Sequence, residues 1–571
     1  MNDGVSTQMT GADLLVETLR AQQVEYIFCS PIGACGPIWE SLARRETAAE
    51  HGLPKYINCR HELLAVGLAA GFFKATGRPQ ICLLPTGLGV LNASIGLHDA
   101  LQERIAMTVI TPDTRSYGLD PSCDPGPEWP FLLTDLGGPV RDSEPVVKWA
   151  HTSSITLDLV ANLQRAMYFA GSVPRGPTLL SVPLDVLMGS APSSLPHRLE
   201  PSATRASDAA IEQAAAILSE SRNPVILACH AGRSPDDRRA LTRLAELLGA
   251  PVFEPLSPSV CNIQRDHPLH GRGTPPPDLL AQADCVLVAG SNAPWHPAQM
   301  NPPPPCKIVL LDEDPLRPRA PFWGYRTDLC IAGDIGLNLN ALCRRLEGIT
   351  INAAPSRMAR WRDFNRASKR QALADARAAA ERAAGIHAAH LFDALRQLLP
   401  EGATILDEII CQHGYMLDVL FQGATFDQIR GYGGALGQGI AQALGVRLAR
   451  PDRLAVSLVG DGAFNYSPIA AYFGMAQQYH VPILVIVCNN GGYQSQKWLT
   501  QAYFPDGAAV RGNNIMGSVI EPDIDYSALA APFGGFGRRV TQISELEDAI
   551  RCALDAIRNG RFAVLDVRVT P

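Results

Sequence analysis

A carboxylate and two amides follow two apolar runs in the C-terminal part of the chain. Gly460-Asp461-Gly462 directly follows the run LAVSLV, and Asn489-Asn490 closely follows the run ILVIV. Such runs are typical of parallel strands that are covered on both faces, and ligands bind at the carboxyl edge of a parallel sheet. A carboxylate and an amide oxygen at neighbouring strand ends can bind one hard cation. The glycines would let a diphosphate approach the backbone closely.

Glu62 is a second candidate for chemistry. It stands in NCRHELLAVGLAAG, residues 58–71, where apolar residues follow it at once. A buried carboxylate among apolar residues is unusual unless it has a task. The simpler alternative is an acid at a helix N-terminus that stabilises the helix dipole. Taken alone, the motif favours that alternative.

Together, the two motifs resemble the thiamine-diphosphate enzymes, and most closely the branch containing acetolactate synthase, benzoylformate decarboxylase and benzaldehyde lyase. The resemblance covers essentially the whole chain. It implies thiamine diphosphate held with Mg²⁺, and metal ligands at the side chains of Asp461 and Asn490 and the carbonyl of Gly492. It also implies that Glu62 hydrogen-bonds the cofactor's aminopyrimidine ring, which promotes loss of a proton from the thiazolium carbon. Paired with the metal motif, Glu62 is interpreted as catalytic.

Further segments match cofactor contacts of this family. The glycines of the metal loop, Gly460 and Gly462, adjoin the diphosphate. Residues 433–437 (GGALG) match the stretch that holds the cofactor bent, with Ala435 beside it and Leu436 beneath the bend; an ordinary core leucine is the alternative. Cys411-Gln412-His413 resembles a segment that touches the diphosphate, and the alternative is a plain helix N-terminus.

The same resemblance assigns a substrate pocket. Residues 489–499 align without gaps with benzoylformate decarboxylase, which places Ser495 and Leu499 in the pocket. Residues 86–92 (TGLGVLN) resemble a turn near the substrate. Three further positions are assigned to the pocket. The first active-site histidine of that decarboxylase corresponds to Pro85, and its pocket serine falls near Gly33. A pocket glutamine of acetolactate synthase and benzaldehyde lyase falls close to Asp113.

A second histidine of that decarboxylase corresponds to His296, which could equally be a surface-loop histidine. Residues 117–130 and the insertion 503–522 are expected to be irregular loops that either cover the site or are mere surface loops. Because Pro85 offers no proton from its side chain or nitrogen, His296 is the one remaining candidate for a proton donor.

Short β-branched runs alternate with longer Ala/Leu-rich stretches, which predicts α/β layers with parallel sheets. Thr10-Gly-Ala-Asp13 predicts a capping box that opens a helix. We expect three doubly wound domains: 1–190 (pyrimidine-binding), 191–346 (middle) and 385–571 (diphosphate-binding), with a polar helical linker at 347–384. The first and third both end in a strand after a Gly-containing turn, which hints at a duplicated fold. Ten strands are predicted, at 26–29, 80–84, 107–111, 178–182, 225–228, 285–289, 307–311, 454–459, 483–487 and 563–567.

Composition limits the class of protein. The chain has 571 residues, of which 46% are hydrophobic and 18% charged, and its net charge is −7. These values exclude a disordered chain and argue against a nucleic-acid partner. No apolar stretch is long enough to cross a bilayer, and no signal peptide is recognised at the N-terminus. The 14 cysteines form no CxxC pair, so reduced thiols and a cytoplasmic location are expected.

The expected function is therefore that of an enzyme for a small-molecule substrate. We expect a carbon–carbon lyase or carboligase, similar to acetolactate synthase, that acts on a 2-oxoacid or 2-hydroxyketone. The alternatives are a simple 2-oxoacid decarboxylase, a cyclic dione hydrolase, or a family member without activity. The family implies a homodimer or homotetramer with sites between subunits. FAD is not expected, because Gly232-Arg233 is only a faint resemblance to flavin-binding members.

Overall fold

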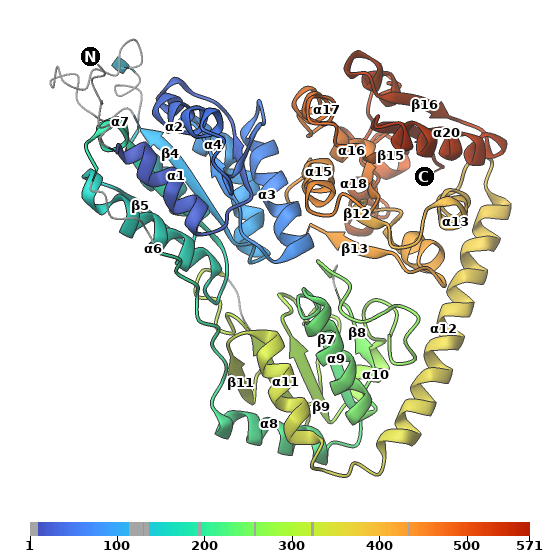
Figure 1. The fold of residues 1–571 in the computed structure, drawn as a ribbon. Coiled ribbons are helices and arrows are strands. Elements are labelled where there is room, and N and C mark those ends of the chain that lie inside the picture. The colour runs from blue at the N-terminus through green and yellow to red at the C-terminus, as the bar shows by residue number, and fades with distance from the viewer. Residues whose placement is uncertain are drawn as a thin grey trace, which may run out of the picture. The chain divides into compact units, whose positions relative to one another are not determined.

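The structure, a computed structural model, describes residues 9–113, 129–130, 136–191, 197–255, 258–320, 325–431 and 434–570. The chain divides into two compact units. The first contains residues 1–202, 433–449 and 468–479, and the second contains residues 203–432, 450–467 and 480–571. The first unit is built on one parallel sheet and the second on two, with helices packed against them (Figure 1).

The first unit contains one sheet of six parallel strands in the order β2-β1-β3-β4-β6-β5. Its strands are β1 Tyr26–Cys29, β2 Lys55–Asn58, β3 Ile81–Leu83, β4 Met107–Asp113, β5 Trp149–Thr152 and β6 Pro177–Pro183. Its helices are α1 Gly11–Ala21, α2 Gly36–Thr47, α3 Glu62–Thr76, α4 Leu88–Gln102, α5 Pro139–Ser143, α6 Leu159–Gly171, α7 Leu184–Met188, α15 Gly439–Ala449 and α17 Ile469–Gln478.

Local sequence explains where these helices begin and what they bury. The predicted capping box of α1 is confirmed: the Thr10 side chain accepts from the Asp13 N–H, and Asp13 reaches back to Thr10. Apolar residues of α1, α2 and α6 share one core with alternate residues of the strands. Such alternation is what the period of two along a strand requires.

Helices α3 and α15 of the first unit approach closely because small residues line their contact. A Cβ atom on Gly67 would lie 2.4 Å from the Ala441 Cβ, and one on Gly71 would lie 2.1 Å from the Gln442 carbonyl oxygen. Gly445 meets the Leu68 carbonyl in the same way. The backbone separation of these helices therefore depends on glycine. It fixes α3, whose first residue is Glu62.

The middle sheet, in the second unit, has five parallel strands in the order β11-β10-β9-β7-β8. Helices α8, α9 and α11 share a core with alternate strand residues, and the other face packs with α10 and Trp295. The strands are β7 Pro224–Ala228, β8 Val252–Phe253, β9 Cys285–Ala289, β10 Lys307–Asp312 and β11 Leu329–Ala332. The helices are α8 Asp208–Glu220, α9 Pro235–Leu248, α10 Pro277–Ala281 and α11 Ile335–Leu346.

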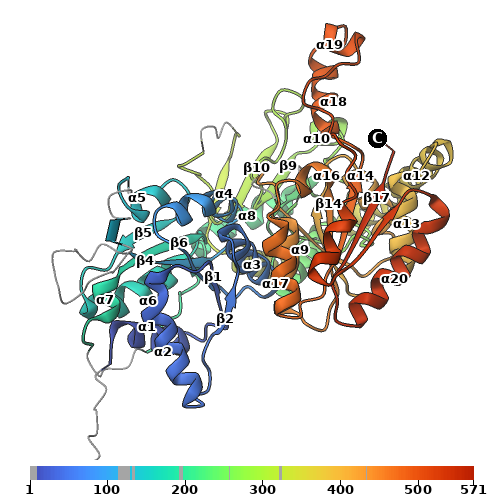
Figure 2. The same ribbon diagram turned by 90° about the horizontal axis from the view of Figure 1, so that it is seen from above.

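The third sheet has six parallel strands in the order β13-β12-β14-β15-β17-β16. Its strands are β12 Thr404–Glu408, β13 Asp427–Arg430, β14 Ala455–Gly460, β15 Leu484–Asn489, β16 Phe536–Val540 and β17 Ala563–Arg568. Helices α13 and α20 cover one core, and Figure 2 shows α18 and α19 projecting away from this sheet. The helices of this region are α13 Ala388–Leu398, α14 His413–Tyr415, α16 Asp461–Phe464, α18 Gln494–Tyr503, α19 Ala508–Arg511 and α20 Leu546–Arg558, with a π-helical turn at Met416–Leu420.

Helix α12, Ala354–Arg382, connects the middle sheet to the third sheet. Its 29 residues would extend about 43 Å at the usual rise per residue. Trp361 packs in the core of the middle sheet, whereas Ala376 and Ala380 pack in the core of the third. The remaining helix surface is largely polar. The predicted helical segment within 347–384 is therefore present, and the domain boundaries stay predictions.

The fold class is confirmed, with differences in detail. All ten predicted strands form, and most ends differ by one or two residues. Within the described residues, seven further strands were not predicted, because they are short or mix polar with apolar residues; β13 (DQIR) is an example. Most of the predicted loop 117–130 lies outside the described residues, and the insertion 503–522 contains α19. Among the residues that the structure describes, no helix is long and apolar enough to cross a membrane.

Candidate active site

The third sheet brings three predicted cofactor segments to one edge. Strands β12, β14 and β15 are neighbours in the sheet and run parallel. The segment with Gln412 and His413 follows β12, the Gly460–Gly462 loop ends β14, and Asn490 follows β15. Their shared position at the carboxyl edge is where open α/β sheets bind ligands.

Two side-chain oxygens converge beside Gly492. The Gly492 N–H donates to Asp461 Oδ2 at 2.8 Å and to Asn490 Oδ1 at 3.2 Å. The Gly492 carbonyl accepts from the Gln494 N–H at 3.1 Å, which leaves its second lone pair. Sequence reasoning predicted these three residues as ligands of one cation, and the structure brings them together.

The electrostatics at Asp461 favour a bound cation. Asp461 is 2% exposed, and burial raises the pKa of its carboxyl although the N–H groups of Gly462 and Gly492 act in the opposite direction. A carboxylate, an amide oxygen and a carbonyl are the donors that Mg²⁺ prefers. Among the described residues no group of three or more His, Cys, Asp or Glu side chains is placed to hold a metal. The ligand set proposed here contains one such residue.

The space around each glycine of the site explains why a larger residue would not fit or why none is present. A Cβ atom on Gly462 would lie 2.7 Å from the Tyr493 ring, and one on Gly492 would lie 2.2 Å from the Ser518 carbonyl oxygen. A Cβ atom on Gly460 would meet nothing within 4 Å. The open space at Gly460 fits the approach of a cofactor diphosphate, and the residues present therefore fit both the metal and the diphosphate.

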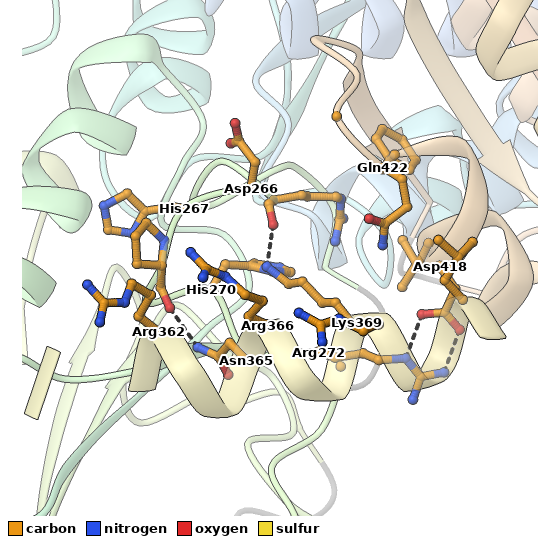
Figure 3. A pocket seen from close by; sticks show the side chains of 18 residues that line it. Asp266, His267, His270, Arg272, Arg362, Asn365, Arg366, Lys369, Asp418 and Gln422 are labelled. Carbon is orange, nitrogen blue, oxygen red and sulfur yellow. Dashed lines mark hydrogen bonds and ion pairs between the residues drawn. The ribbon is translucent and has the colours of Figure 1, made fainter. Parts of the chain in front are cut away.

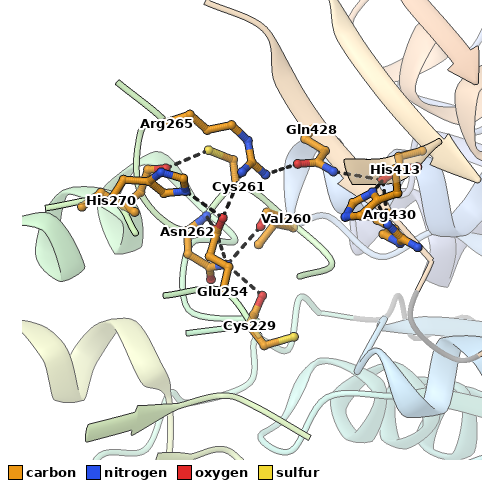
Figure 4. A network of polar contacts seen from close by, with 12 residues as sticks. Cys229, Glu254, Val260, Cys261, Asn262, Arg265, His270, His413, Gln428 and Arg430 are labelled. Carbon is orange, nitrogen blue, oxygen red and sulfur yellow. Dashed lines mark hydrogen bonds and ion pairs between the residues drawn. The ribbon is translucent and has the colours of Figure 1, made fainter. Parts of the chain in front are cut away.

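His413 is oriented by a buried acid that sequence reasoning missed (Figure 4). His413 Nδ1 lies 2.7 Å from Asp407 Oδ2. Nδ1 also contacts Arg430 Nη1, so both ring contacts of His413 in the described part of the chain are at Nδ1, and Nε2 is left for another partner. Gln428 and Arg430 also donate to Asp407 Oδ2, each at 3.1 Å. Burial alone would raise the pKa of Asp407, but His413 and Arg430 lower it to about 2.

The other cofactor segment belongs to the first unit. Gly433 lies outside the described residues, whereas Ala435 and Leu436 are half-buried. Gly434 and Gly437 have φ values of 81° and 83°, a conformation that suits glycine. Leu436 is therefore not a fully buried core residue, which was the alternative explanation. Its role beneath a bent cofactor stays a prediction.

Glu62 is the first residue of α3 and is held by two donors. The Ser30 hydroxyl donates to Glu62 Oε1 at 2.9 Å, and the Asn92 amide donates to Oε2. Glu62 is half-buried rather than fully buried as expected, because it stands in the first helical turn at the sheet edge. An acid that only balanced the dipole would need no such pair of side-chain donors. These two donors fix the orientation of the carboxylate.

Three predicted pocket residues follow the strands of the first sheet. Gly33 comes after β1 and is exposed, while Pro85 comes after β3 and is half-buried. Asp113 ends β4, is buried, and accepts from the Ser181 hydroxyl at 3.1 Å. Beside Pro85, the Thr86 hydroxyl oxygen is buried and has no hydrogen-bond partner in the described part of the chain. An orphaned polar atom at this edge fits a ligand that would satisfy it.

The other pocket candidates belong to the second unit. Ser495 and Leu499 are four residues apart on α18, so they share one helix face. Ser495 is half-buried, and Leu499 is 47% exposed. His296 lies exposed in the loop after β9, next to the buried Trp295. This position fits the surface-loop alternative for His296, and its catalytic role stays a prediction.

Three residues that contact the predicted set, Ser30, Asp407 and Arg430, were not predicted as functional, whereas Asn92 ends the segment 86–92 that was predicted to lie near the substrate. Ser30 and Asn92 hold Glu62, and Asp407 and Arg430 hold His413. Ser30 directly follows a predicted strand, which was an available signal. Asp407 stands in β12, whose TILDE sequence mixes apolar and acidic residues and gave no clear strand pattern.

Comparison with known protein families identifies the class. Residues 9–127 match the N-terminal thiamine pyrophosphate binding domain of thiamine pyrophosphate enzymes, 211–342 match the central domain, and 414–567 match the C-terminal thiamine pyrophosphate binding domain. The chain belongs to the family of thiamine-diphosphate-dependent enzymes. This confirms the family resemblance and the order of the three parts.

Individual relatives place the chain within the family. It is 29% identical over 528 residues to benzoylformate decarboxylase of Pseudomonas aeruginosa, covering 88% of this chain and 90% of the relative. It is 26% identical to the chloroplastic acetolactate synthase of Arabidopsis thaliana, covering 95% of this chain and 79% of the relative. The branch is therefore the one that contains these two activities.

Solved structures share the fold. A thiamine diphosphate-dependent 4-hydroxybenzoylformate decarboxylase of Rhodococcus jostii RHA1 matches with a TM-score of 0.77 and 22% identity, covering 98% of this chain and 99% of the other. Benzoylformate decarboxylase of Polynucleobacter necessarius matches with a TM-score of 0.79 and 20% identity, covering 98% of each chain.

Proposed function

We propose that the protein is a thiamine-diphosphate- and Mg²⁺-dependent carbon–carbon lyase or carboligase acting on a 2-oxoacid or 2-hydroxyketone. The observation that carries the proposal is the convergence of Asp461 Oδ2 and Asn490 Oδ1 beside Gly492. Together with the Gly492 carbonyl, these atoms would hold Mg²⁺ against the cofactor's diphosphate. When bound, the cofactor supplies a nucleophilic carbon and accepts the electrons released from the substrate.

The residues of the chain have separate tasks in this proposal. Glu62 is held by Ser30 and Asn92, and it would accept a hydrogen bond from the cofactor's aminopyrimidine ring and so control the proton at the thiazolium carbon. His413, held by Asp407 through Nδ1, offers Nε2 to the diphosphate. Ser495 and Leu499 present one face of α18 to the substrate.

Pro85 favours ligation over simple decarboxylation. After CO₂ leaves, the reacting carbon takes either a proton or a second carbonyl compound. A positioned acid speeds the first outcome, and a proline has no proton to give from its side chain or nitrogen. The second outcome therefore has more time to occur in this protein.

A simple 2-oxoacid decarboxylase is the second candidate. It is favoured by the similarity to benzoylformate decarboxylase, at 29% identity. His296 is the proton donor this alternative would use, although it lies exposed in a loop of the second unit.

Product analysis distinguishes the two. Pyruvate and benzoylformate are each supplied as donor, with and without an aldehyde or second oxoacid as acceptor. Acyloin or acetolactate-type products should dominate when an acceptor is present. Free aldehyde as the main product under those conditions would reject ligation and support the decarboxylase. No turnover of any donor by protein loaded with cofactor and Mg²⁺ would reject both.

We further propose a homodimer or homotetramer, because in this family one chain supplies the glutamate and another the metal site. Sedimentation equilibrium measures the assembly directly. A monomer with full activity would contradict the proposal.

A further inference from the structure

A cavity of about 370 Å³ lies beside α12 in the second unit (Figure 3), and none of the predicted cofactor residues is among those that line it. Its walls are α12, the segment 265–273 and the segment 417–423. Six cationic side chains line it against two carboxylates, those of Asp266 and Asp418. The cationic residues are Arg265, Arg272, Arg362, Arg366, Lys369 and Arg370.

Three of the arginines already have acidic partners. Arg362 lies 3.1 Å from the neighbouring Asp363 on α12. Arg272 forms a bidentate pair with Asp418, with Nε–Oδ1 and Nη2–Oδ2 distances of 2.5 and 2.6 Å. Arg265 pairs with the buried Glu254, 3.2 Å from it. The excess positive charge therefore belongs to α12.

The other α12 cations of the cavity, Arg366, Lys369 and Arg370, gain little from the protein itself. Lys369 Nζ donates to the Arg265 carbonyl and forms no ion pair within the described residues. Burial, with Arg265 nearby, lowers the pKa of Lys369 to about 8, so the folded chain disfavours this charge. Arg366 and Arg370 likewise have no ion-pair partner in the described part of the chain.

The spacing of these residues works against helix stability. Arg362, Arg366 and Arg370 follow one another at intervals of four, so they stack along one helix face. Like charges at that spacing destabilise a helix. Lys369 falls on the same side, three residues after Arg366. These like charges destabilise the protein when no ligand is bound. An anionic ligand that removes the repulsion between them would explain why they are clustered.

We propose that this cavity binds an oligophosphate, a multiply charged phosphate anion such as the polyphosphate group of a nucleotide. Guanidinium groups match phosphate oxygens in pairs, and Lys adds a point charge. The cavity volume falls in the range of small-molecule sites. Asn365, also in the wall, donates to the Pro268 carbonyl at 2.9 Å and fixes the loop against α12.

The cavity also touches the contacts that hold His413. Arg265 donates to Gln428, and Gln428 donates to Asp407 (Figure 4). Binding must therefore be measured with the cofactor site filled, so that an added phosphate cannot occupy it.

Calorimetric titration of the holoenzyme tests the proposal. The protein is saturated with thiamine diphosphate, free Mg²⁺ is held constant, and inorganic tripolyphosphate is added. We expect one saturable site per chain, weaker binding at higher salt, and much weaker binding of monophosphate. ATP is titrated in parallel: tighter binding than tripolyphosphate indicates a nucleotide site, and equal binding indicates a site for bare phosphates.

Variants localise the site. Arg366→Gln and Lys369→Gln should each weaken tripolyphosphate binding at least tenfold, and Arg366→Lys should weaken it less. Arg382→Gln is the matched control, because Arg382 is exposed on the last turn of the same helix and lies outside the cavity. Arg366 is exposed, so its variant should fold, which circular dichroism verifies. Absence of saturable binding to the wild type, or equal weakening by Arg366→Gln and Arg382→Gln, would overturn the proposal.

Discussion

The first and third sheets have the same topology but carry different chemistry. Numbered along the chain within each sheet, their strands follow the same order, 2-1-3-4-6-5, and every pair is parallel. In the third sheet, Asp461 and Asn490 follow the third and fourth strands. In the first sheet the corresponding strands lead to Pro85 and Asp113, and Glu62 comes after the second strand.

The two sheets therefore share the position of a binding edge, and they differ in the side chains that lie at that edge. Both sheets place loop residues at a carboxyl edge, where ligands can reach them. Within the described residues, the third edge brings two hard oxygen donors together beside Gly492. The first edge instead holds one carboxylate between two side-chain donors, Ser30 and Asn92. The proposed function thus assigns metal binding to the third edge and proton control to the first.

The largest expected effect comes from removing the acid of the first edge. Glu62→Gln should lower turnover by about 10²–10⁴-fold, the range for loss of general acid–base catalysis, while cofactor affinity changes little. The amide keeps the shape but loses the charge. The readout is exchange of the cofactor's thiazolium proton for deuterium, followed by NMR, together with turnover.

The matched control is Glu46→Gln, an exposed acid on α2 of the same unit. It should leave both rates unchanged. Wild-type proton exchange in Glu62→Gln would show that the first edge does not control the proton, and the contrast between the two sheets would fail.

Removing the acid of the third edge should act on binding rather than on the proton. Asp461→Asn should raise the Mg²⁺ concentration needed for cofactor binding by about 10–100-fold, because the amide lacks the charge that a hard cation prefers. Tryptophan fluorescence during thiamine diphosphate titrations at fixed Mg²⁺ measures this. Asp566→Asn is the control: Asp566 is equally buried in the third sheet but accepts from Asn489 and Tyr526 instead. It should cost stability without changing the Mg²⁺ dependence.

A smaller, pH-dependent effect is expected at Asp407. Its pKa is lowered to about 2 in the folded protein from 3.8, so its ionised form stabilises the fold. The contribution is fully present above about pH 4 and is lost as the pH falls toward 2. Asp407→Asn should therefore lower the free energy of unfolding by on the order of 2 kcal/mol at pH 7, and the difference from wild type should shrink below pH 4.

Urea unfolding at a series of pH values checks this. Asp393→Asn, which removes an exposed pair with Arg396, should change stability little at any pH. An Asp407→Asn deficit that did not shrink in acid would mean that packing, not charge, is what Asp407 contributes.

Much of this arrangement could be predicted from the sequence. Buried strands were predictable because their apolar runs are continuous. Motif residues that directly follow such runs were therefore placed correctly at the carboxyl edge of the sheet. The predicted strand Ile483–Val487, for example, correctly placed Asn490 directly after a strand of the third sheet. The capping box at Thr10 was equally predictable because its signal is local.

The rest depends on contacts between distant residues. Asp407 meets Gln428 and Arg430, both on β13, a short polar strand with no apolar pattern. Arg366 and Lys369 face Arg265 and Arg272 across a cavity, although they are about one hundred residues apart in sequence. Glu62 was expected to be buried because its neighbours are apolar, yet those neighbours form the helix behind it.

The smallest expected effect concerns Pro85, and it tests whether the first edge decides the reaction's outcome. Pro85→His would place an acid where the chain has none, and protonation of the reacting carbon should then compete better with addition of a second carbonyl compound. We expect the ratio of free aldehyde to ligated product to rise several-fold. Pro85→Ala is the control, because it removes the ring without adding a donor. Chromatographic analysis of products from a 2-oxoacid donor with an acceptor present gives the ratio. An equal rise in both variants would assign the change to altered packing against Gly89, which Pro85 contacts closely. A rise in Pro85→His alone would show that a single position after the third strand sets the fate of the product.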